Sequence, residues 1–284
     1  MYVVTGATGS LGRLVVEGLL AKVPADRVAA VARDASKAAD LAARGVEVRV
    51  ADYDDPASLD GAFGAGDRVL FVSGSEAGRR VPQHRAVVAA TREAGVALLA
   101  YTSVLGGPAA DFELAREHQV TEQAILDSGL PYVFLRNGWY HEVYTGNLGP
   151  VLAHGAVVAS AGEGRVASAA RADYAAAAVA VLTGDGHENT AYELSGDVAW
   201  SFTEYAAELS RQTGREIVYS DVPAGTHREI LLGAGVPAPF ADILVDVDAA
   251  IARGLLATVT GDLAKLIGRP TTPIADGIAA ALKP

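Results

Sequence analysis

The chain has no cysteine, one methionine and only four lysines among its 284 residues. Without cysteine it forms no disulfide, has no thiolate nucleophile and binds no metal through sulfur. Its six histidines are scattered and show neither HxxxH nor HxH spacing, so we expect no metal site.

Basic clusters and long apolar runs are also missing. The 23 lysines and arginines face 34 aspartates and glutamates, a formal net charge of −11, which argues against nucleic acid and acidic membrane surfaces as partners. No uncharged apolar stretch approaches the roughly 20 residues of a membrane span. The first residues lack the basic segment of a secretory signal, so we expect a cytoplasmic protein.

What the chain does have, at its start, is a glycine-rich motif. A short apolar run at 2–5 precedes Gly6, Gly9 and Gly12, and an amphipathic segment follows. Read as strand, loop and helix, this pattern lets backbone approach a ligand and aims the free N–H groups of the helix at it. Such a site suits a pyrophosphate, so the motif predicts a nucleotide site.

Strand and helix patterns then alternate along the first half of the chain. Strands are predicted at 27–32, 46–50, 68–73, 96–101 and 131–136, and helices at 36–44, 56–63, 84–94 and 114–127. This alternation implies βαβ crossovers and a parallel sheet covered on both faces. We therefore predict an α/β fold with a Rossmann-type doubly wound parallel sheet.

The second half changes character and predicts a separate lobe. We assign residues 1–138 to the nucleotide-binding domain, with a return strand near 190–196. Residues 139–284 then form mainly a smaller, mostly helical substrate lobe that is interleaved with the first. Ser201 and Glu204 form a predicted capping box for a helix that runs to about Thr213, and a strand is expected at 217–219.

Arg33 follows the second predicted strand directly. At this position an acidic residue usually holds the ribose of NAD, whereas a basic residue accommodates the 2′-phosphate of NADP. Arginine suits a phosphate because its planar, always charged fork binds two oxygens at once. Two alternatives stay open: Arg33 as an ordinary surface residue, and Asp34 as a ribose ligand. We favour NADP(H) as the cofactor.

Stretches along nearly the whole chain resemble the NmrA-like atypical short-chain dehydrogenases, most closely their NADPH-dependent, quinone-reducing bacterial members. The matching stretches are TGATGSLG at 5–12, VARD at 31–34, ADYDD at 51–55, SGSEAGRRVPQHR at 73–85, AYTS at 100–103, LRNGWY at 135–140, RADYAAA at 171–177 and KLIGRPTT at 265–272. The triphenylmethane-dye reductases, a related branch, share the glycine loop, the Arg33 segment and the FLRN strand, but are less similar around Ser75–His84.

The resemblance implies a set of cofactor-binding residues. The glycine loop would wrap the pyrophosphate, Arg33 would bind the 2′-phosphate, and three later segments would line the ribose, nicotinamide and quinone. These residues are Gly6, Ala7, Thr8, Gly9, Ser10, Leu11, Arg33, Ser73, Gly74, Ser75, Asn137, Gly138, Trp139, Tyr140, His141, Glu142, Ala170, Arg171, Ala172, Asp173 and Tyr174. The sequence departs from the family at Gly74, where serine is expected, and at His141, where a small polar residue is expected.

The chain lacks the Tyr-x-x-x-Lys pair of most short-chain dehydrogenases, since no tyrosine has a lysine four residues later. Alcohol–ketone interconversion by that pair is excluded. A quinone needs little acid help, because its product is an aromatic hydroquinone anion, so we predict an NADPH:quinone oxidoreductase. Asn137 and Tyr140 are expected to orient or polarise the quinone carbonyl, with Ser103 and His118 as further catalytic candidates. His118 shares a helix face with Glu122 and is equally well explained as structural.

Three questions stay open from the sequence. The protein is alternatively an NADP(H)-binding redox sensor without turnover, or a reductase of another planar electrophile such as a triphenylmethane dye. The apolar stretch Ile243–Val247 fits a homodimer interface as well as it fits a core.

Overall fold

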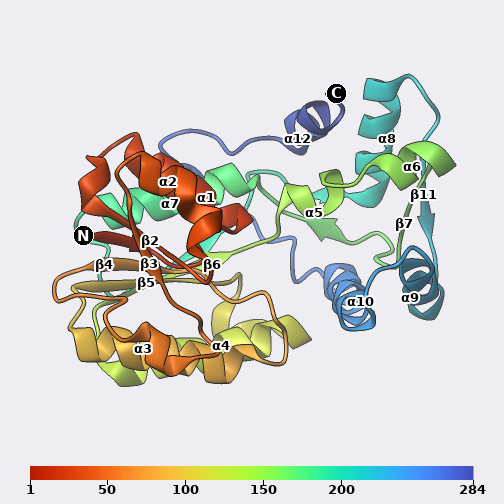
Figure 1. Cartoon of the computed structure of the whole chain (residues 1–284). Helices are drawn as coiled ribbons and strands as arrows, with labels where there is room; N and C mark the ends of the chain where they lie inside the picture. Colours follow the sequence, from red (N-terminus) through yellow and green to blue (C-terminus); the bar gives the residue numbers. More distant parts are fainter. Residues whose placement is uncertain (284) are drawn as a thin grey trace. The chain divides into compact units, whose positions relative to one another are not determined.

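The largest sheet of the computed structural model, which describes residues 1–283, has seven strands (Figure 1). Its strand order is β3-β2-β1-β4-β5-β6-β9. The strands are β1 (Tyr2–Val4), β2 (Val28–Ala32), β3 (Glu47–Val50), β4 (Arg68–Phe71), β5 (Leu98–Val104), β6 (Tyr132–Asn137) and β9 (Thr190–Leu194).

The first six strands run parallel, and their order reverses between β1 and β4. Val3 of β1 lies opposite Ala29 of β2 on one side and Val69 of β4 on the other. This confirms the predicted Rossmann-type doubly wound fold. In such sheets a ligand crevice opens beyond the carboxyl ends of the strands at the reversal, which here are β1 and β4.

Helices cover both faces of this sheet. Figure 1 shows α1 (Ser10–Leu20), α2 (Ala39–Ala43) and α7 (Arg171–Thr183) on one face, and α3 (Arg80–Ala94) and α4 (Glu113–Ser128) on the other. Apolar side chains from both faces of the strands are fully buried, among them Val3, Val4, Leu70 and Phe71. A strand buried on both faces reads as a continuous apolar run, which explains why these strands were visible in the sequence.

The chain divides into two interleaved compact units. The first comprises Met1–Gly107, Glu117–Asn137 and Arg171–Glu193. It contains α7, which the division at residue 138 assigned to the substrate lobe, so that assignment is corrected. The reason is packing: α7 is alanine-rich and buried along most of its length, and a Cβ on Gly18 of α1 would lie 2.9 Å from Val179 of α7. A helix that is apolar on all sides belongs in a core.

The second unit comprises Pro108–Arg116, Gly138–Ala170 and the chain from Leu194 onward. Its strands form two small sheets, parallel β7 (Ala156–Ala159) with β11 (Val218–Asp221), and antiparallel β8 (Arg165–Val166) with β10 (Trp200–Ser201). Its helices are α5 (His141–Thr145), α6 (Gly149–His154), α8 (Phe202–Thr213), α9 (Ala224–Gly233), α10 (Ala238–Ala252), α11 (Asp262–Ile267) and α12 (Ile274–Ala281).

Local sequence signals were accurate at some helix ends and wrong at others. The capping box of α8 is confirmed: Glu204 N–H donates to Ser201 Oγ at 3.2 Å, and Ser201 N–H donates to the Glu204 carboxylate at 2.9 Å. The helix predicted at 56–63 is wrong, because only a 3₁₀ turn, η3 (Pro56–Leu59), forms before Asp60 becomes extended and Gly61 takes a left-handed φ of +76°. The helix predicted at 36–44 splits into the 3₁₀ turn η2 (Ala35–Ala38) and α2.

None of the helices within residues 1–283 combines the length and the apolar character that crossing a bilayer requires.

Candidate functional site

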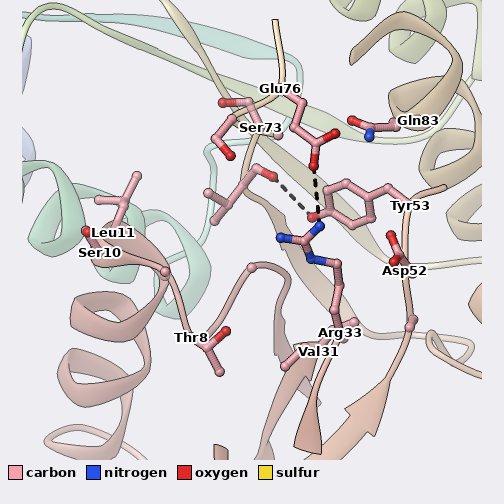
Figure 2. Close-up of a pocket in the computed structure, with 18 of the residues that line it drawn as sticks. Thr8, Ser10, Leu11, Val31, Arg33, Asp52, Tyr53, Ser73, Glu76 and Gln83 are labelled. Atoms are coloured by element: carbon pink, nitrogen blue, oxygen red, sulfur yellow. Dashed lines mark hydrogen bonds and ion pairs between the residues drawn. The ribbon is translucent and has the colours of Figure 1, made fainter. Parts of the chain in front are cut away.

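A cavity of about 420 Å³ opens in the first unit beyond the carboxyl ends of β1, β2 and β4 (Figure 2). Four chain segments line it: the loop after β1, the end of β2, the residues after β3, and the loop from β4 into α3. The lining residues are Gly6, Thr8, Gly9, Ser10, Leu11, Gly12, Val31, Ala32, Arg33, Lys37, Ala51, Asp52, Tyr53, Val72, Ser73, Gly74, Ser75, Glu76 and Gln83. The cavity therefore lies at the reversal of strand order, as the fold predicts.

The glycine loop is shaped by close backbone contact. Gly6 has a φ of +57°, in the left-handed region that favours glycine. A Cβ on Gly12 would lie 2.3 Å from Gly6 O, so α1 can pack on the loop only when residue 12 has no side chain. Gly9 is the N-cap of α1, and no side chain caps this end. The first-turn N–H groups of α1 are thus left for an anion, and the helix dipole favours negative charge there.

Arg33 lies at the rim of the cavity. Its side chain is 65% exposed, and Nη1 lies 3.4 Å from Glu76 Oε1. Figure 2 shows the guanidinium pointing toward Glu76, beside Tyr53. Glu76 also accepts a 2.9 Å hydrogen bond from Arg79, which in turn pairs with Asp54 at 2.9 Å. A single long, solvated ion pair holds an arginine only weakly, so the Arg33 guanidinium can turn to a phosphate.

Asp34, the alternative ribose ligand, is used elsewhere. Its carboxylate accepts hydrogen bonds from the Ser36 backbone N–H at 2.9 Å and from the Ser36 hydroxyl at 2.7 Å, and so caps η2. These bonds lower the pKa of Asp34. Because the carboxylate is occupied in this cap, Arg33 rather than Asp34 is the residue that β2 presents to the cavity.

Tyr53 forms part of the cavity wall and ties three strand ends together. Its hydroxyl hydrogen-bonds to Thr5 Oγ1 at 2.5 Å and to Val72 O at 3.1 Å, and Thr5 Oγ1 accepts from Val72 N–H at 2.9 Å. The ring packs edge-on against Phe71. Burial raises the pKa of Tyr53, so the phenol stays neutral and serves as a strut.

Together these features fit a dinucleotide that carries an extra phosphate. The loop leaves no room for side chains where backbone must approach a pyrophosphate, and the open helix end supplies donors and positive potential. Arg33 supplies a movable cation at the rim, and Lys37 lines the same cavity. Lys37 and Gln83 are lining residues that we did not predict: Lys37 belongs to none of the quoted stretches, and Gln83 lies in the 73–85 stretch but several residues beyond the strand end.

Among the predicted cofactor residues, those from the loop after β1, the end of β2 and the loop after β4 come together at this cavity, except Ala7, which is fully buried. The serine-to-glycine departure at position 74 has a physical reason. A Cβ there would lie 3.1 Å from Gln83 Oε1 and 3.5 Å from His84 Nε2, so glycine gives the loop room against α3.

Ser103 and His118 lie outside the cavity lining and are engaged internally. Ser103 Oγ donates to Glu122 Oε1 at 2.6 Å. Arg136 donates to the same carboxylate twice, from Nε to Oε1 at 2.9 Å and from Nη2 to Oε2 at 2.7 Å. Arg136 also pairs with Glu193 at 2.8 Å, as expected of a strand-end arginine. His118 Nδ1 lies within hydrogen-bond distance of the Tyr101 hydroxyl, at 2.7 Å, and burial lowers the pKa of His118 to about 3. These contacts favour the structural alternative for His118, and they give Ser103 a structural partner in place of the catalytic role expected of it.

The remaining predicted residues are divided between the two units, and none lines this cavity. In the first unit Asn137 ends β6 and is 5% exposed, while Arg171–Tyr174 opens α7 with Asp173 and Tyr174 buried. In the second unit Tyr140 bridges to Ala169 and precedes α5. The predicted cofactor-binding residues that belong to the second unit are Gly138, Trp139, Tyr140, His141, Glu142 and Ala170.

His141, the second departure from the family pattern, is a satisfied interior residue. It is 2% exposed, and its ring nitrogens lie 2.8 Å from Ser168 Oγ and 2.8 Å from Thr272 O. Because the carbonyl can only accept, Nε2 carries the proton and Nδ1 accepts. Within its own unit the imidazole thus joins α5 to the segment after α11.

Comparison with known proteins agrees with this geometry. The family model described as NAD(P)H-binding matches residues 6–185. Quinone oxidoreductase 2 of Escherichia coli is 45% identical over 98% of this chain and 97% of its own length. An NmrA-like family domain-containing oxidoreductase of Aspergillus flavus is 29% identical over 98% of this chain and 93% of its own.

Two solved structures extend the comparison. The crystal structure of the E. coli NADPH-dependent quinone oxidoreductase complexed with NADPH superimposes with a TM-score of 0.97 at 44% identity, over 100% of both chains. The Citrobacter sp. triphenylmethane reductase complexed with NADP(H) has a TM-score of 0.96 at 41% identity, over 99% of this chain and 100% of its own.

Proposed function

Because this chain belongs to the NAD(P)H-binding family, we propose that it is an NADPH-dependent reductase that transfers hydride to a quinone. One observation carries the proposal: a glycine-lined cavity with an open helix end and Arg33 at its rim, in a chain that shares 44% identity and its whole fold with an NADPH-dependent quinone oxidoreductase. The cavity supports the cofactor and the relative supports the acceptor.

Three parts of the cavity have distinct tasks in this proposal. The N–H groups at the start of α1 and the backbone of the loop after β1 bind the pyrophosphate. Arg33 exchanges its contact with Glu76 for the 2′-phosphate. The Ser73–Ser75 segment borders the ribose and nicotinamide. NADPH, when bound, supplies the hydride.

The chain provides little acid–base chemistry of its own. Asn137 and Tyr140 are proposed to orient or polarise the quinone carbonyl, each through a neutral hydrogen-bond donor. Ser103 and His118 are assigned to the scaffold, because their polar atoms are bonded to Glu122 and Tyr101. The hydroquinone anion takes its proton from water, so no buried general acid is required. We further propose that the protein works in the cytoplasm, on small planar quinones.

The test is to mix the protein with NADPH and a small quinone such as 1,4-benzoquinone and to follow the absorbance of the reduced nicotinamide. We expect quinone-dependent oxidation well above the rate without protein, and slower turnover by Asn137→Ala and Tyr140→Phe. Tight NADPH binding without quinone-dependent oxidation would contradict the enzyme and favour a redox sensor.

A parallel assay with a cationic triphenylmethane dye tests the acceptor. The Citrobacter relative makes this the relevant competitor, since it is similar to this chain over nearly its whole length. We expect the quinone to be reduced with the higher kcat/KM. The opposite ranking would move the proposed acceptor from quinones to dyes while leaving the cofactor assignment in place.

A further inference from the structure

The peptide unit of Gly74 is held by two buried side chains of α3. Gly74 N–H donates to His84 Nε2 at 3.0 Å, and Arg80 Nε donates to Gly74 O at 2.6 Å. Arg80 and His84 are four residues apart and so project from the same face of the helix. His84 is 1% exposed and Arg80 is 8% exposed. Gly74 lies in the cavity wall just after β4, where the strand pairing has ended. Its backbone is held there by the side chains of α3.

A chain of hydrogen bonds fixes which nitrogen of His84 accepts. His84 Nδ1 lies 2.8 Å from Thr121 Oγ1, and the Thr121 hydroxyl donates to Glu117 O at 2.8 Å. The hydroxyl proton is thereby used, so Nδ1–H must donate to Thr121 and Nε2 must accept from Gly74. In this series of hydrogen bonds every donor therefore points the same way, from Gly74 in the cavity wall through His84 of α3 and Thr121 to the backbone of α4.

The surroundings of His84 preserve this neutral form. Phe71 packs edge-on against the imidazole at 4.9 Å between ring centres. The Tyr101 hydroxyl lies 3.5 Å from His84 Nδ1 and closer, at 2.7 Å, to His118 Nδ1. Burial and the neighbouring Arg80 charge lower the pKa of His84 to about 3. A protonated ring would have lost the acceptor that holds Gly74.

We propose that His84 is a positioning residue for the cofactor, which holds the Ser73–Ser75 wall of the cavity in place through Gly74 N–H. The inference rests on the proposed function for the identity of the cofactor. His84 acts through Gly74 and not directly on the reacting groups. The His84 side chain keeps the Ser73–Ser75 segment in the conformation that binds NADPH. Loss of this side chain therefore raises the KM for NADPH and leaves kcat nearly unchanged.

Two amide substitutions separate this role from a general structural one. The oxygen of His84→Gln reaches the position of Nε2 and can still accept from Gly74 N–H, whereas the shorter His84→Asn places its amide near Nδ1. We expect His84→Asn to raise the KM for NADPH about tenfold, with kcat within about twofold of the native value. His84→Gln should return the KM to within about threefold of native.

A second measurement does not need the cofactor. Hydrogen exchange of the Gly74 amide, followed by NMR in the free protein, should be slow in the native chain and in His84→Gln and at least tenfold faster in His84→Asn. Equal KM values for folded Asn and Gln variants, or unchanged Gly74 exchange in His84→Asn, would overturn the proposal. If the native protein bound no NADPH, the proposed function would fail, and Gly74 exchange would still decide whether His84 holds the wall.

Discussion

At the residue scale, Arg33 is the side chain that we propose selects NADP(H) over NAD(H). Two competing explanations of this position were open from the sequence, and the structure separates them by what each side chain contacts. Asp34 caps η2, whereas Arg33 stands at the rim with 65% of its side chain exposed and one weak ion pair to Glu76. We expect the exchange of that partner for a phosphate to be favourable, because a guanidinium can bind a phosphate through two parallel hydrogen bonds, whereas Glu76 offers a single contact at 3.4 Å.

Replacing Arg33 with aspartate should therefore cost NADPH binding selectively. We expect the Kd for NADPH, measured by nicotinamide fluorescence, to rise about 30-fold, as the loss of a charge-assisted contact worth about 2 kcal/mol implies. The Kd for NADH should stay within about twofold. Arg27→Asp makes the same charge change at an exposed residue before the other end of β2 and is the matched control. Equal losses for both cofactors would show that Arg33 does not bind the phosphate.

Residue identity alone predicted those site residues that follow a strand in a recognisable motif. The glycine loop, Arg33 and Ser73–Ser75 could be located because parallel strands bring their carboxyl ends to one edge. Lys37 was missed because it enters the cavity from a 3₁₀ turn that no pattern marks. The role of His84 was also hidden, since its tautomer depends on Thr121 of another helix.

At the element scale, the contact between α1 and its preceding loop joins stability to binding. Gly12 lies in the first turn of α1, and the missing Cβ is what allows this turn to rest on Gly6 O. The same turn presents the N–H groups that are proposed to hold the pyrophosphate. A displaced turn would lose packing and donors together.

We therefore expect Gly12→Ala to weaken NADPH binding at least tenfold and to lower the free energy of unfolding by about 1–3 kcal/mol, as overpacking does. Titration calorimetry and urea denaturation measure the two effects. Gly225→Ala in α9 is the matched control, because a Cβ there meets nothing within 4 Å, and it should be neutral or slightly stabilising. An unchanged Kd in folded Gly12→Ala would disprove the importance of this close approach.

Helix types proved harder to predict than helix positions. Pro56–Leu59 forms only a 3₁₀ turn, because Asp60 is extended and Gly61 has a left-handed φ, whereas Ala35–Ala38 is a 3₁₀ turn that leads directly into α2. The interleaving of α7 with the first unit was equally invisible. The many alanines of α7 indicate that the helix is buried, but they do not indicate which of the two units it packs in.

At the scale of the whole molecule, two buried neutral histidines couple stability to pH. The pKa values of His84 and His118 are lowered to about 3 in the folded chain, against about 6.5 for an exposed histidine. The unfolded chain therefore binds more protons than the folded one between about pH 6.5 and 3. The contribution of the two histidines to the free energy of unfolding is fully present above pH 6.5 and is lost as the pH falls toward 3.

Replacing one of these histidines should make the free energy of unfolding less dependent on pH. Between pH 7 and pH 5, we expect the free energy of unfolding to fall by about 2 kcal/mol more in the native chain than in His118→Gln, since each missing proton costs about 1.4 kcal/mol per pH unit. Urea denaturation followed by circular dichroism at both pH values measures the difference. Parallel profiles for the two proteins would mean that His118 titrates normally when folded.

The alternation of segments between the two units limits how this protein can be cut or recombined. A fragment ending at residue 138 would lack α7 and β9, leaving the apolar surface of α1 uncovered and one side of β6 without a strand. A single protease nick followed by separation, or one crossover between two genes, thus cannot deliver a self-sufficient cofactor half. A chimera of two such chains keeps a complete cofactor unit only if it retains all three of its segments, Met1–Gly107, Glu117–Asn137 and Arg171–Glu193.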